Sequence, residues 1–329
     1  MIIKQCEIPI KARLLEALLY RLPAAHPKRP ILESELSKCM AGYRGEQSID
    51  SVLAALPEKE YLLLHDLRIP STPYPFQLDI FILSPSFFLI LEVKNIAGEI
   101  YFDDDFHQLI QTKNDQAQAY DDPILQVNRQ RTELLQWLAS KKAPTIPIET
   151  LVVSANSLTI VRAKSKEITE KVVRRNSLAL KIHSLAEKYQ EDILSKKELK
   201  KLTNLLLKAH TPYIPKLLTT YKISATELLT GVQCPNCRAL PMKRKWGKWH
   251  CQSCSYCSSD AHLAAIRDYA LLIKPTITNR ELRDFLRLDS ASIAAKWLHS
   301  MNLPSTGSTR DRVYHLNWHD FAADWHDYS

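Results

Sequence analysis

Two carboxylates and a lysine stand close together in the first third of the sequence. Asp79 lies in one strand-like run, and Glu92 and Lys94 lie near the end of the next, two residues apart. Residues two apart on a strand point to the same face of a sheet. If Pro85 and Ser86 form a two-residue hairpin loop, position 79 pairs with position 92. The pattern therefore predicts that two carboxylates and an ammonium group meet.

Phosphodiester hydrolysis needs side chains of these types. A divalent ion held by hard oxygen ligands polarises the phosphate and lowers the pKa of an attacking water. Asp79, Glu92 and the carbonyl of Val93 are candidate ligands for Mg²⁺ or Mn²⁺. Lys94 would orient the water or stabilise the charge that develops. The alternative is a surface ion pair between Glu92 and Lys94 at a strand end.

These residues need a sheet to position them, and the hydrophobic pattern predicts one. Three strand-like runs cover residues 61–69, 76–83 and 87–93, and the third is apolar on both faces, as expected for a central strand. Helical patterns at 42–56, 123–138 and 177–210 flank these runs, and a further strand is predicted at 150–161. The interleaved strands and helices indicate an α/β domain.

Several short motifs occur in a recognisable order. They are Gly42-x-x-Gly45-Glu46, then Gln77-Leu78-Asp79, then Glu92-Val93-Lys94-Asn95 with Gly98, then Pro123 and Gln126. Together they resemble the nuclease-related domain (NERD) of the PD-(D/E)xK nuclease superfamily, over roughly residues 41–190. Leu78 stands where the superfamily's name would put a proline.

The resemblance implies a restriction-endonuclease-like fold, in which a mixed sheet is flanked by helices. It also implies that Glu46 joins Asp79 and Glu92 as a metal-site acid, and that Gln126 lies on the helix that packs over the site. From the residues alone, Glu46 is equally explained as an acid favoured at a helix N-terminus. The alternative role for Gln126 is capping or packing.

Four cysteines form two C-x-x-C pairs near residue 240. Cys234 and Cys237 are separated from Cys251 and Cys254 by thirteen residues, a spacing that suits one tetrahedral, structural Zn²⁺. His250 and Cys257 are reserve ligands. The segment resembles the zinc ribbons at the C-termini of some topoisomerases.

The insert between the cysteine pairs alternates basic and aromatic side chains, which suits phosphate contacts and base stacking. The residues concerned are Lys243, Arg244, Lys245, Trp246, Lys248 and Trp249. The alternative is that at least one tryptophan packs beneath the ribbon and that the lysines are only solvated.

The C-terminal residues resemble a winged helix-turn-helix. A capping-box pattern from Thr278 to Glu281 opens one helix, a second helix follows, and a β-ribbon follows that. The residues placed to contact nucleic acid are Ser292, Lys296 and His299 on the second helix, and Arg310 and Arg312 on the wing. The alternative is a helical hairpin that serves only in packing.

Charge and composition agree with a protein that binds a polyanion. The net charge is +8, with an acidic excess over residues 41–130 and a basic excess over residues 131–230. Cysteines paired as C-x-x-C indicate a metal site, not a secreted disulfide framework. No apolar run reaches membrane-spanning length. We expect a cytoplasmic protein without membrane contact.

The sequence thus predicts five segments. They are an N-terminal helical segment (1–40), a nuclease-like domain (41–195), a basic helical linker (196–230), a zinc ribbon (231–258) and a helix-turn-helix-like domain (259–329). The favoured interpretation is a Mg²⁺- or Mn²⁺-dependent DNA endonuclease whose C-terminal parts bind nucleic acid. The alternatives are a catalytically inactive DNA-binding scaffold and a nuclease directed at RNA.

Overall fold

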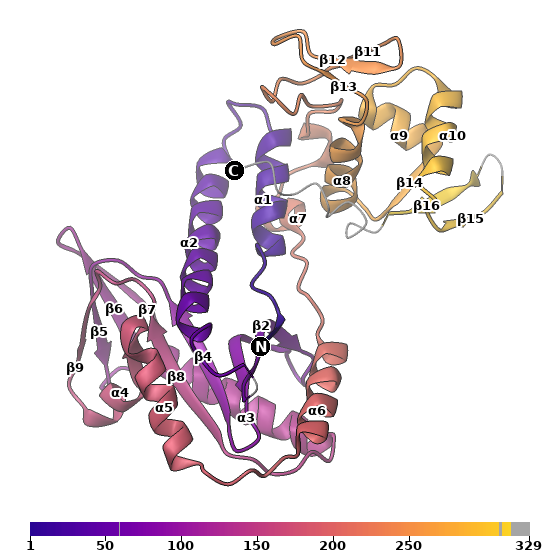
Figure 1. The fold of residues 1–329 in the computed structure, drawn as a ribbon. Coiled ribbons are helices and arrows are strands. Elements are labelled where there is room, and N and C mark those ends of the chain that lie inside the picture. Colours follow the sequence, from indigo (N-terminus) through magenta and orange to yellow (C-terminus); the bar gives the residue numbers. More distant parts are fainter. Residues whose placement is uncertain (59, 309–310, 317–329) are drawn as a thin grey trace. The chain divides into compact units, whose positions relative to one another are not determined.

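The computed structural model describes residues 1–58, 60–308 and 311–316, and the chain forms two compact units (Figure 1). The first contains residues 1–9 and 38–213. The second contains residues 10–37 and the described residues from 214 onward. The division therefore falls inside helix α2 (Arg29–Leu53). No helix among the described residues is long and apolar enough to cross a membrane.

A mixed six-stranded sheet forms the centre of the first unit. Its order is β1-β2-β3-β4-β8-β10. Strands β2, β3 and β4 pair antiparallel, whereas β4, β8 and β10 run parallel and β1 runs parallel to β2. The strands span Ile2–Lys4, Leu62–Ile69, Phe76–Leu83, Phe88–Lys94, Ile148–Ser154 and Val172–Arg174. The expected mixed sheet flanked by helices is confirmed.

Strand β4 is buried on both faces, as its uninterrupted apolar sequence predicts. Phe88 and Ile90 belong to the core that also contains side chains of α3 (Pro123–Ser140) and α6 (Lys196–Ala209). Leu89 and Leu91 belong to the opposite core, with side chains of α2 and α5 (Leu178–Lys188). Full burial of each such side chain contributes about 1.5–3 kcal/mol. Helices therefore cover both faces of the strand that carries Glu92 and Lys94.

A second, four-stranded sheet has the order β7-β6-β5-β9. Its strands span Gln116–Asp121, Gln108–Lys113, Glu99–Asp103 and Ile160–Ala163, and helix α4 (Lys166–Lys171) follows β9. The prediction of one strand over 150–161 is wrong, because β8 ends at Ser154 and β9 joins the other sheet. The Asn156 side chain accepts a hydrogen bond from the Leu158 N–H (3.0 Å), which closes the turn between β8 and β9.

The two units differ from the segments predicted from sequence. Leu199, Leu202 and Leu206 of α6 are buried in the core of the first unit, so this basic helix is part of the folded domain and not a linker. Helix α1 (Ile10–Arg21) groups with the C-terminal unit, where Leu15 and Leu18 pack with Leu217 of α7 (Leu217–Tyr221).

The second unit combines a small ribbon with a helical domain. The ribbon has the strand order β11-β12-β13, and the helical domain carries a sheet of order β14-β16-β15. The strands β11 to β16 span Lys243–Lys245, Lys248–His250, Cys257–Ser258, Thr276–Thr278, Ser305–Thr306 and Val313–His315. Helices α8, α9 and α10 span His262–Leu272, Asn279–Leu286 and Ala291–Ser300. One hydrophobic core includes side chains from both parts.

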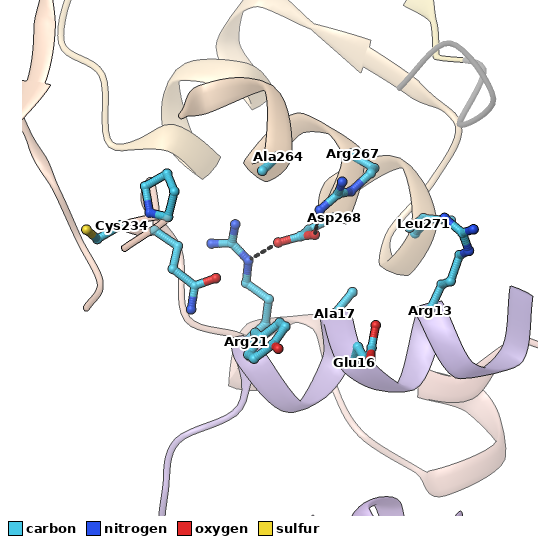
Figure 2. A pocket seen from close by; sticks show the side chains of 12 residues that line it. Arg13, Glu16, Ala17, Arg21, Cys234, Ala264, Arg267, Asp268 and Leu271 are labelled. Carbon is cyan, nitrogen blue, oxygen red and sulfur yellow. Dashed lines mark hydrogen bonds and ion pairs between the residues drawn. The ribbon is translucent and has the colours of Figure 1, made fainter. Parts of the chain in front are cut away.

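A buried ion pair fastens α1 to α8 (Figure 2). The Arg21 Nε donates to Asp268 Oδ2 at 2.9 Å, and Arg21 Nη1 donates to the Gly231 carbonyl at 2.7 Å. The Arg21 side chain is only 1% exposed. Removal of one partner from such a pair costs about 3–5 kcal/mol, because the other charge stays buried. This contact explains why an N-terminal helix belongs to the C-terminal unit.

Candidate functional site

The hairpin between β3 and β4 has the register expected from the sequence. Leu83 pairs with Phe88 and Ile80 pairs with Leu91. The Ser84 N–H donates to the Phe87 carbonyl at 3.0 Å, which closes the two-residue loop. Continuation of this register by one pair brings position 79 opposite position 92.

Asp79 lies where regular strand pairing stops. The ladder between β3 and β4 ends at Ile80, and the Asp79 Oδ2 accepts the next available N–H, that of Val93, at 2.8 Å. On the other side of β3, Asp66 adopts a left-handed conformation (φ 47°) and is omitted from the ladder between His65 and Leu67. The Asp79 carboxylate therefore takes the place of a backbone carbonyl as the acceptor of the Val93 N–H.

Glu92 is held by two side chains, although it lies near a strand end. Its carboxylate is 2% exposed. The Lys94 Nζ donates to Glu92 Oε1 at 2.6 Å and to Gln126 Oε1 at 3.1 Å, and Gln130 Nε2 donates to Glu92 Oε2 at 2.8 Å. The alternative of a solvated surface ion pair is wrong, because Glu92 is buried. Gln126 and Gln130 lie one turn apart on α3.

Helix α2 brings Glu46 toward the same place. Gly45 is buried, and a Cβ atom there would lie 2.5 Å from the Asn95 Cβ, so only glycine permits this approach of α2 to the end of β4. The Asn95 Nδ2 also donates to the Ala41 carbonyl at 2.7 Å. Glu46 lies well inside a 25-residue helix, so a role as a helix N-terminal acid does not apply.

Burial and neighbouring charges change the pKa of two of these acids, Asp79 and Glu46. Burial, followed by the negative charges of Glu92 and Glu46, raises the pKa of Asp79 well above its usual value. Burial, followed by the charges of Asp66 and Glu92, raises the pKa of Glu46 to about 7. We call Glu46, Asp79, Glu92 and Lys94 the carboxylate centre. With all three acids ionised, the centre would carry more negative charge than the single ammonium of Lys94 neutralises, and a divalent cation would offset this excess.

Oxygen ligands for such a cation are available on the hairpin. The N–H and C=O of one strand residue point to the same neighbouring strand, so the Val93 carbonyl faces the side where Asp79 accepts its N–H. Among the described residues, only the four C-x-x-C cysteines place three or more potential side-chain ligand atoms within 4.8 Å of one another. The acids of the carboxylate centre are therefore more widely spaced than the thiols.

The raised pKa of Glu46 predicts how the stability of the metal-free protein depends on pH. The folded state keeps a proton on Glu46 up to about pH 7, whereas the unfolded chain releases it near its ordinary value of 4.5. Stability from this group is thus complete below about pH 4.5 and is lost as pH rises through about 7. The hydrogen-exchange protection of peptides from β3 and β4, measured at several pH values, reports this loss of stability. Wild type should lose more protection with rising pH than Glu46→Gln, and equal losses would contradict the prediction.

The two glycines of α2 provide a matched pair of substitutions. Gly45→Ala is expected to destabilise the first unit by about 1–3 kcal/mol, because the added methyl overlaps Asn95. Gly42 is exposed, and a methyl group added there would have no atom within 4 Å, so Gly42→Ala should stabilise by about 0.5–1 kcal/mol. Urea unfolding of each variant, monitored by the hydrogen-exchange protection of peptides from α2, measures both changes in stability. Equal effects would remove the proposed close approach to Asn95.

The four cysteines of the C-x-x-C pairs form a compact cluster. The Sγ atoms of Cys234 and Cys254 are 3.6 Å apart, and those of Cys237 and Cys251 are 3.4 Å apart. A tetrahedral Zn²⁺ with bonds of about 2.3 Å would set these separations at about 3.8 Å, whereas a disulfide needs about 2.05 Å. A hydrogen bond from Asn236 is the largest influence that lowers the pKa of Cys254, to about 6. The cluster is therefore suited to a metal ion.

The reserve ligands stand outside this cluster. His250 on β12 and Cys257 on β13 are register partners, and the Cys257 Sγ lies 3.1 Å from His250 Nδ1. Neither residue belongs to the group of four close thiols. The structure thus favours the four-cysteine set over either substitution.

The two tryptophans of the ribbon have opposite environments. Trp246 is 92% exposed at the tip of the β11–β12 hairpin, beside the exposed side chains of Lys243, Lys245 and Lys248. Trp249 is 1% exposed and packs between the ribbon and the helices, so its expected role in base stacking is wrong.

Arg244 is also directed inward, in contrast to its lysine neighbours. Its guanidinium lies 4.6 Å from the Trp297 ring centroid and 5.7 Å from that of Trp249. His262 stacks on Trp297 with centroids 3.9 Å apart. This stack joins β11 and β12 to α8 and α10. Arg244 therefore contributes to packing more than to an exposed basic surface.

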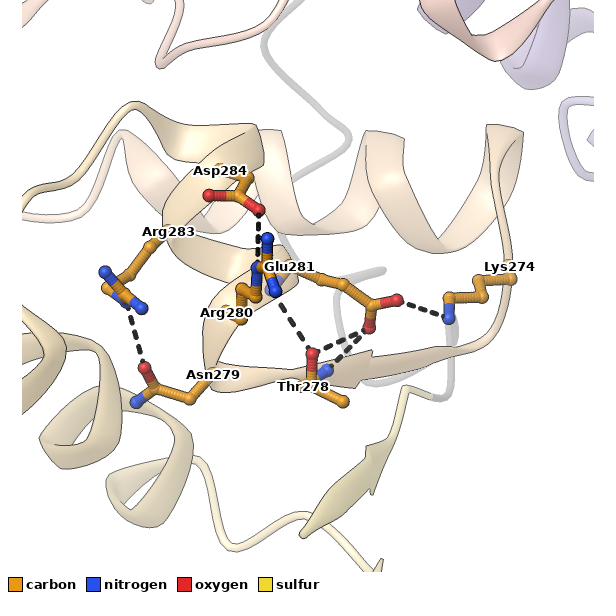
Figure 3. A network of polar contacts seen from close by, with 7 residues as sticks. All are labelled: Lys274, Thr278, Asn279, Arg280, Glu281, Arg283 and Asp284. Atoms are coloured by element: carbon orange, nitrogen blue, oxygen red, sulfur yellow. Dashed lines mark hydrogen bonds and ion pairs between the residues drawn. The ribbon is translucent and has the colours of Figure 1, made fainter. Parts of the chain in front are cut away.

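The C-terminal domain has the element order of a winged helix: α8, β14, α9, α10, β15, β16. The predicted capping box opens α9 (Figure 3), where the Thr278 hydroxyl accepts from the Glu281 N–H at 3.2 Å and Glu281 Oε2 accepts from the Thr278 N–H at 2.9 Å. The candidate contact residues Ser292, Lys296 and His299 on α10 are exposed, as is Arg312 near β16. Arg310 lies outside the described residues.

Sequence reasoning missed Gln130, which holds Glu92 from the helix side. Its signal was its position four residues after Gln126, which places both amides on one face of α3. It also missed the irregular pairing at Asp66, for which the sequence offers no local signal.

The comparison with known families agrees with this geometry. Residues 41–155 match the model of the family described as nuclease-related domain, a range that runs from α2 to just past β8 and includes all four members of the carboxylate centre. No curated protein and no solved structure matches the chain significantly. The chain therefore contains a nuclease-related domain in its first unit, followed by a four-cysteine ribbon.

Proposed function

We propose that the protein is a metal-dependent nuclease that hydrolyses phosphodiester bonds in DNA, acting as an endonuclease in DNA processing or defence. The observation that carries this proposal is the burial of Glu92 next to Asp79, with Lys94 and Gln130 bound to its two oxygens. A scaffold has no physical need to collect these charges at a strand end, because burying them without a cation is costly.

The residues of the carboxylate centre fit Mg²⁺ or Mn²⁺. Asp79, Glu92 and the Val93 carbonyl would hold the ion, with Glu46 as a further ligand. All four supply hard oxygen atoms, which these ions prefer. When bound, the ion would polarise the scissile phosphate and neutralise charge in the transition state. The raised pKa values of Asp79 and Glu46 support this assignment, since a cation would restore their ionised forms.

Lys94 is the residue that would act on the phosphate directly. Its ammonium has three N–H donors, of which Glu92 and Gln126 accept two. The remaining donor is available to a phosphate oxygen or to the attacking water. Gln130 would keep the Glu92 carboxylate in its orientation from the opposite side.

The second unit would hold zinc and contact nucleic acid. Cys234, Cys237, Cys251 and Cys254 would bind one structural Zn²⁺, since their thiols leave no open position for catalysis. Trp246 would stack on an unpaired base. The basic residues that would contact phosphates are Lys243, Lys245, Lys248, Lys296 and Arg312.

A substrate panel tests this proposal. The purified protein is incubated with linear, supercoiled and single-stranded DNA and with RNA, with and without Mg²⁺, beside Asp79→Ala and Lys94→Ala. We expect Mg²⁺-dependent cleavage of DNA by wild type and none by either variant. Equal cleavage by all three proteins would reject the active-site assignment, and cleavage of RNA alone would reject DNA as the substrate.

A further inference from the structure

A basic groove lies between the C-terminal end of α3 and the exposed side of α6, within the first unit. Its volume is about 720 Å³. Lys141 and Lys142 line one side and α6 lines the other, with the exposed Leu205 among its residues. We call this surface the lysine groove and define it by Lys141, Lys142, Lys197, Lys200, Lys201 and Lys208.

The positive charge of the six lysines exceeds the negative charge in the lining of the groove, where Glu198 is the acid. Within the described part of the chain, no ion pair joins any of its six lysines to a carboxylate. The acid in its lining, Glu198, accepts hydrogen bonds from the Ser195 hydroxyl at 2.6 Å and the Ser195 N–H at 2.9 Å. Glu198 thus serves the capping box of α6.

The stability of α6 does not explain its lysines. Lys196 and Lys197 occupy its first turn, where the helix dipole favours acids and disfavours cations. Lys197 and Lys201 are four residues apart, a like-charge spacing that further destabilises a helix. Lys141 and Lys142, in contrast, follow the C-terminus of α3, where cations are favoured. The α6 lysines therefore carry a cost that a ligand of opposite charge would offset.

We propose that the lysine groove binds the phosphate backbone of double-stranded DNA at a distance from the carboxylate centre. The identity of the nucleic acid rests on the proposed function. From Lys197 to Lys208, α6 rises by about 17 Å, which corresponds to about five base pairs of duplex. From Gln126 to Lys141, α3 rises by about 22 Å, or about six base pairs. The groove would therefore fix the register of a duplex well outside the cleavage point.

The test measures DNA binding, not cleavage. The full chain carrying Asp79→Ala, loaded with zinc and without added Mg²⁺, is titrated with a short labelled duplex over a range of KCl concentrations. The comparison protein adds Lys197→Gln, Lys201→Gln and Lys208→Gln. We expect its affinity to fall by about tenfold or more and the salt slope of log affinity to decrease by about 2–3.

A control variant that loses the same number of charges elsewhere distinguishes a specific binding site from a general effect of net charge. Three exposed lysines of the first unit far from α6 in sequence are replaced instead, namely Lys113→Gln, Lys164→Gln and Lys166→Gln. This control should change the salt slope by less than about one. Circular dichroism of both triple variants verifies that neither loses helix content.

Three other outcomes of the titration would count against the proposal or change the ligand. Equal binding by the groove variant and the control overturns it, as does the absence of duplex binding by the parent protein. Tighter lysine-dependent binding of single-stranded DNA or of polyglutamate would replace duplex DNA by that ligand. A failure of the nuclease proposal would appear separately, as an absence of cleavage in the substrate panel while groove-dependent binding persists.

Discussion

Replacement of Glu92 by glutamine is expected to reduce the rate of phosphodiester cleavage by about a thousandfold or more, with the fold retained. The substitution keeps the size of the side chain and removes its negative charge. An amide is a poor ligand for Mg²⁺, and it no longer neutralises Lys94. Single-turnover cleavage of the preferred substrate at saturating Mg²⁺ measures the loss.

The surroundings of Glu92 indicate that this variant will fold. Gln130 Nε2 donates to Glu92 Oε2, while Gln130 Oε1 is buried without a hydrogen-bond partner. If the Gln130 amide rotates by half a turn, this oxygen can accept from the new amide at position 92. The hydrogen bond between positions 92 and 130 is thus kept as the charge is removed, and the number of unsatisfied buried groups does not rise. A large loss of activity would then report chemistry and not unfolding.

Gln130→Leu should reduce the cleavage rate less than Glu92→Gln does. It removes the group that orients Glu92 but leaves the carboxylate, so we expect a loss of about 10–100-fold, as is typical of residues that support a metal ligand. The affinity for Mg²⁺ should weaken together with the rate. If the Glu92→Gln variant folds and still cleaves at the wild-type rate, then Glu92 and Lys94 have only a structural role.

The parts of this site that the sequence predicts are those fixed by local rules. The register that brings Asp79 toward Glu92 follows from hairpin arithmetic around Pro85 and Ser86, and the structure confirms this register as far as the pair Ile80–Leu91. The capping box at Thr278 and the four-cysteine cluster are equally local, since each depends on residue types at short spacings. Each of these features can be predicted from the sequence because it depends on residues close together in the chain.

The parts that sequence reasoning missed depend on tertiary packing. The sequence predicts an N-terminal helical segment (1–40) separate from a helix over 42–56, yet α2 runs unbroken from Arg29 to Leu53, and Gly45 inside it lies against Asn95. The strand after Ser154 joins a different sheet, which no local preference specifies. In each case the deciding partner is more than forty residues away or on another sheet.

The difference between Trp246 and Trp249 was within reach of the sequence. Lys245 pairs with Lys248, so Trp246 and Gly247 form a two-residue turn, and both have positive φ (47° and 80°). Glycine at the second position of such a turn readily adopts the positive φ that the turn requires. The turn places Trp246 at an exposed tip and leaves Trp249 on a strand, where one face can be buried.

Loss of zinc is expected to unfold the ribbon and to loosen the packing of α8 and α10 with it. Cys251→Ser should reduce the zinc content well below one ion per chain, because one of four thiolate ligands is removed. The ribbon has few apolar residues of its own, so metal binding supplies much of its folding free energy. Elemental analysis of the purified variant measures the loss of zinc.

The consequence extends to the helices because the aromatic stack crosses between the two parts. The ring centroid of Trp249 lies 6.3 Å from that of His262 and 6.1 Å from that of Trp297. The guanidinium of Arg244 lies over the rings of Trp249 and Trp297. Without the ribbon, Trp249 becomes solvated and the face of Trp297 is uncovered. We expect a red shift in tryptophan emission and faster hydrogen exchange in α8 and α10, while peptides from β3 and β4 serve as internal reference.

Cys257→Ser is the matched control for this prediction. Cys257 is exposed and contacts His250, outside the cluster of four thiols. This variant should keep a full complement of zinc, the emission of wild type and the protection of α10. Because both substitutions replace sulfur by oxygen within one small ribbon, a difference between them isolates the metal. Equal zinc content in the two variants would refute the four-cysteine ligand set, and zinc loss without faster exchange in α8 and α10 would refute the coupling through Trp249.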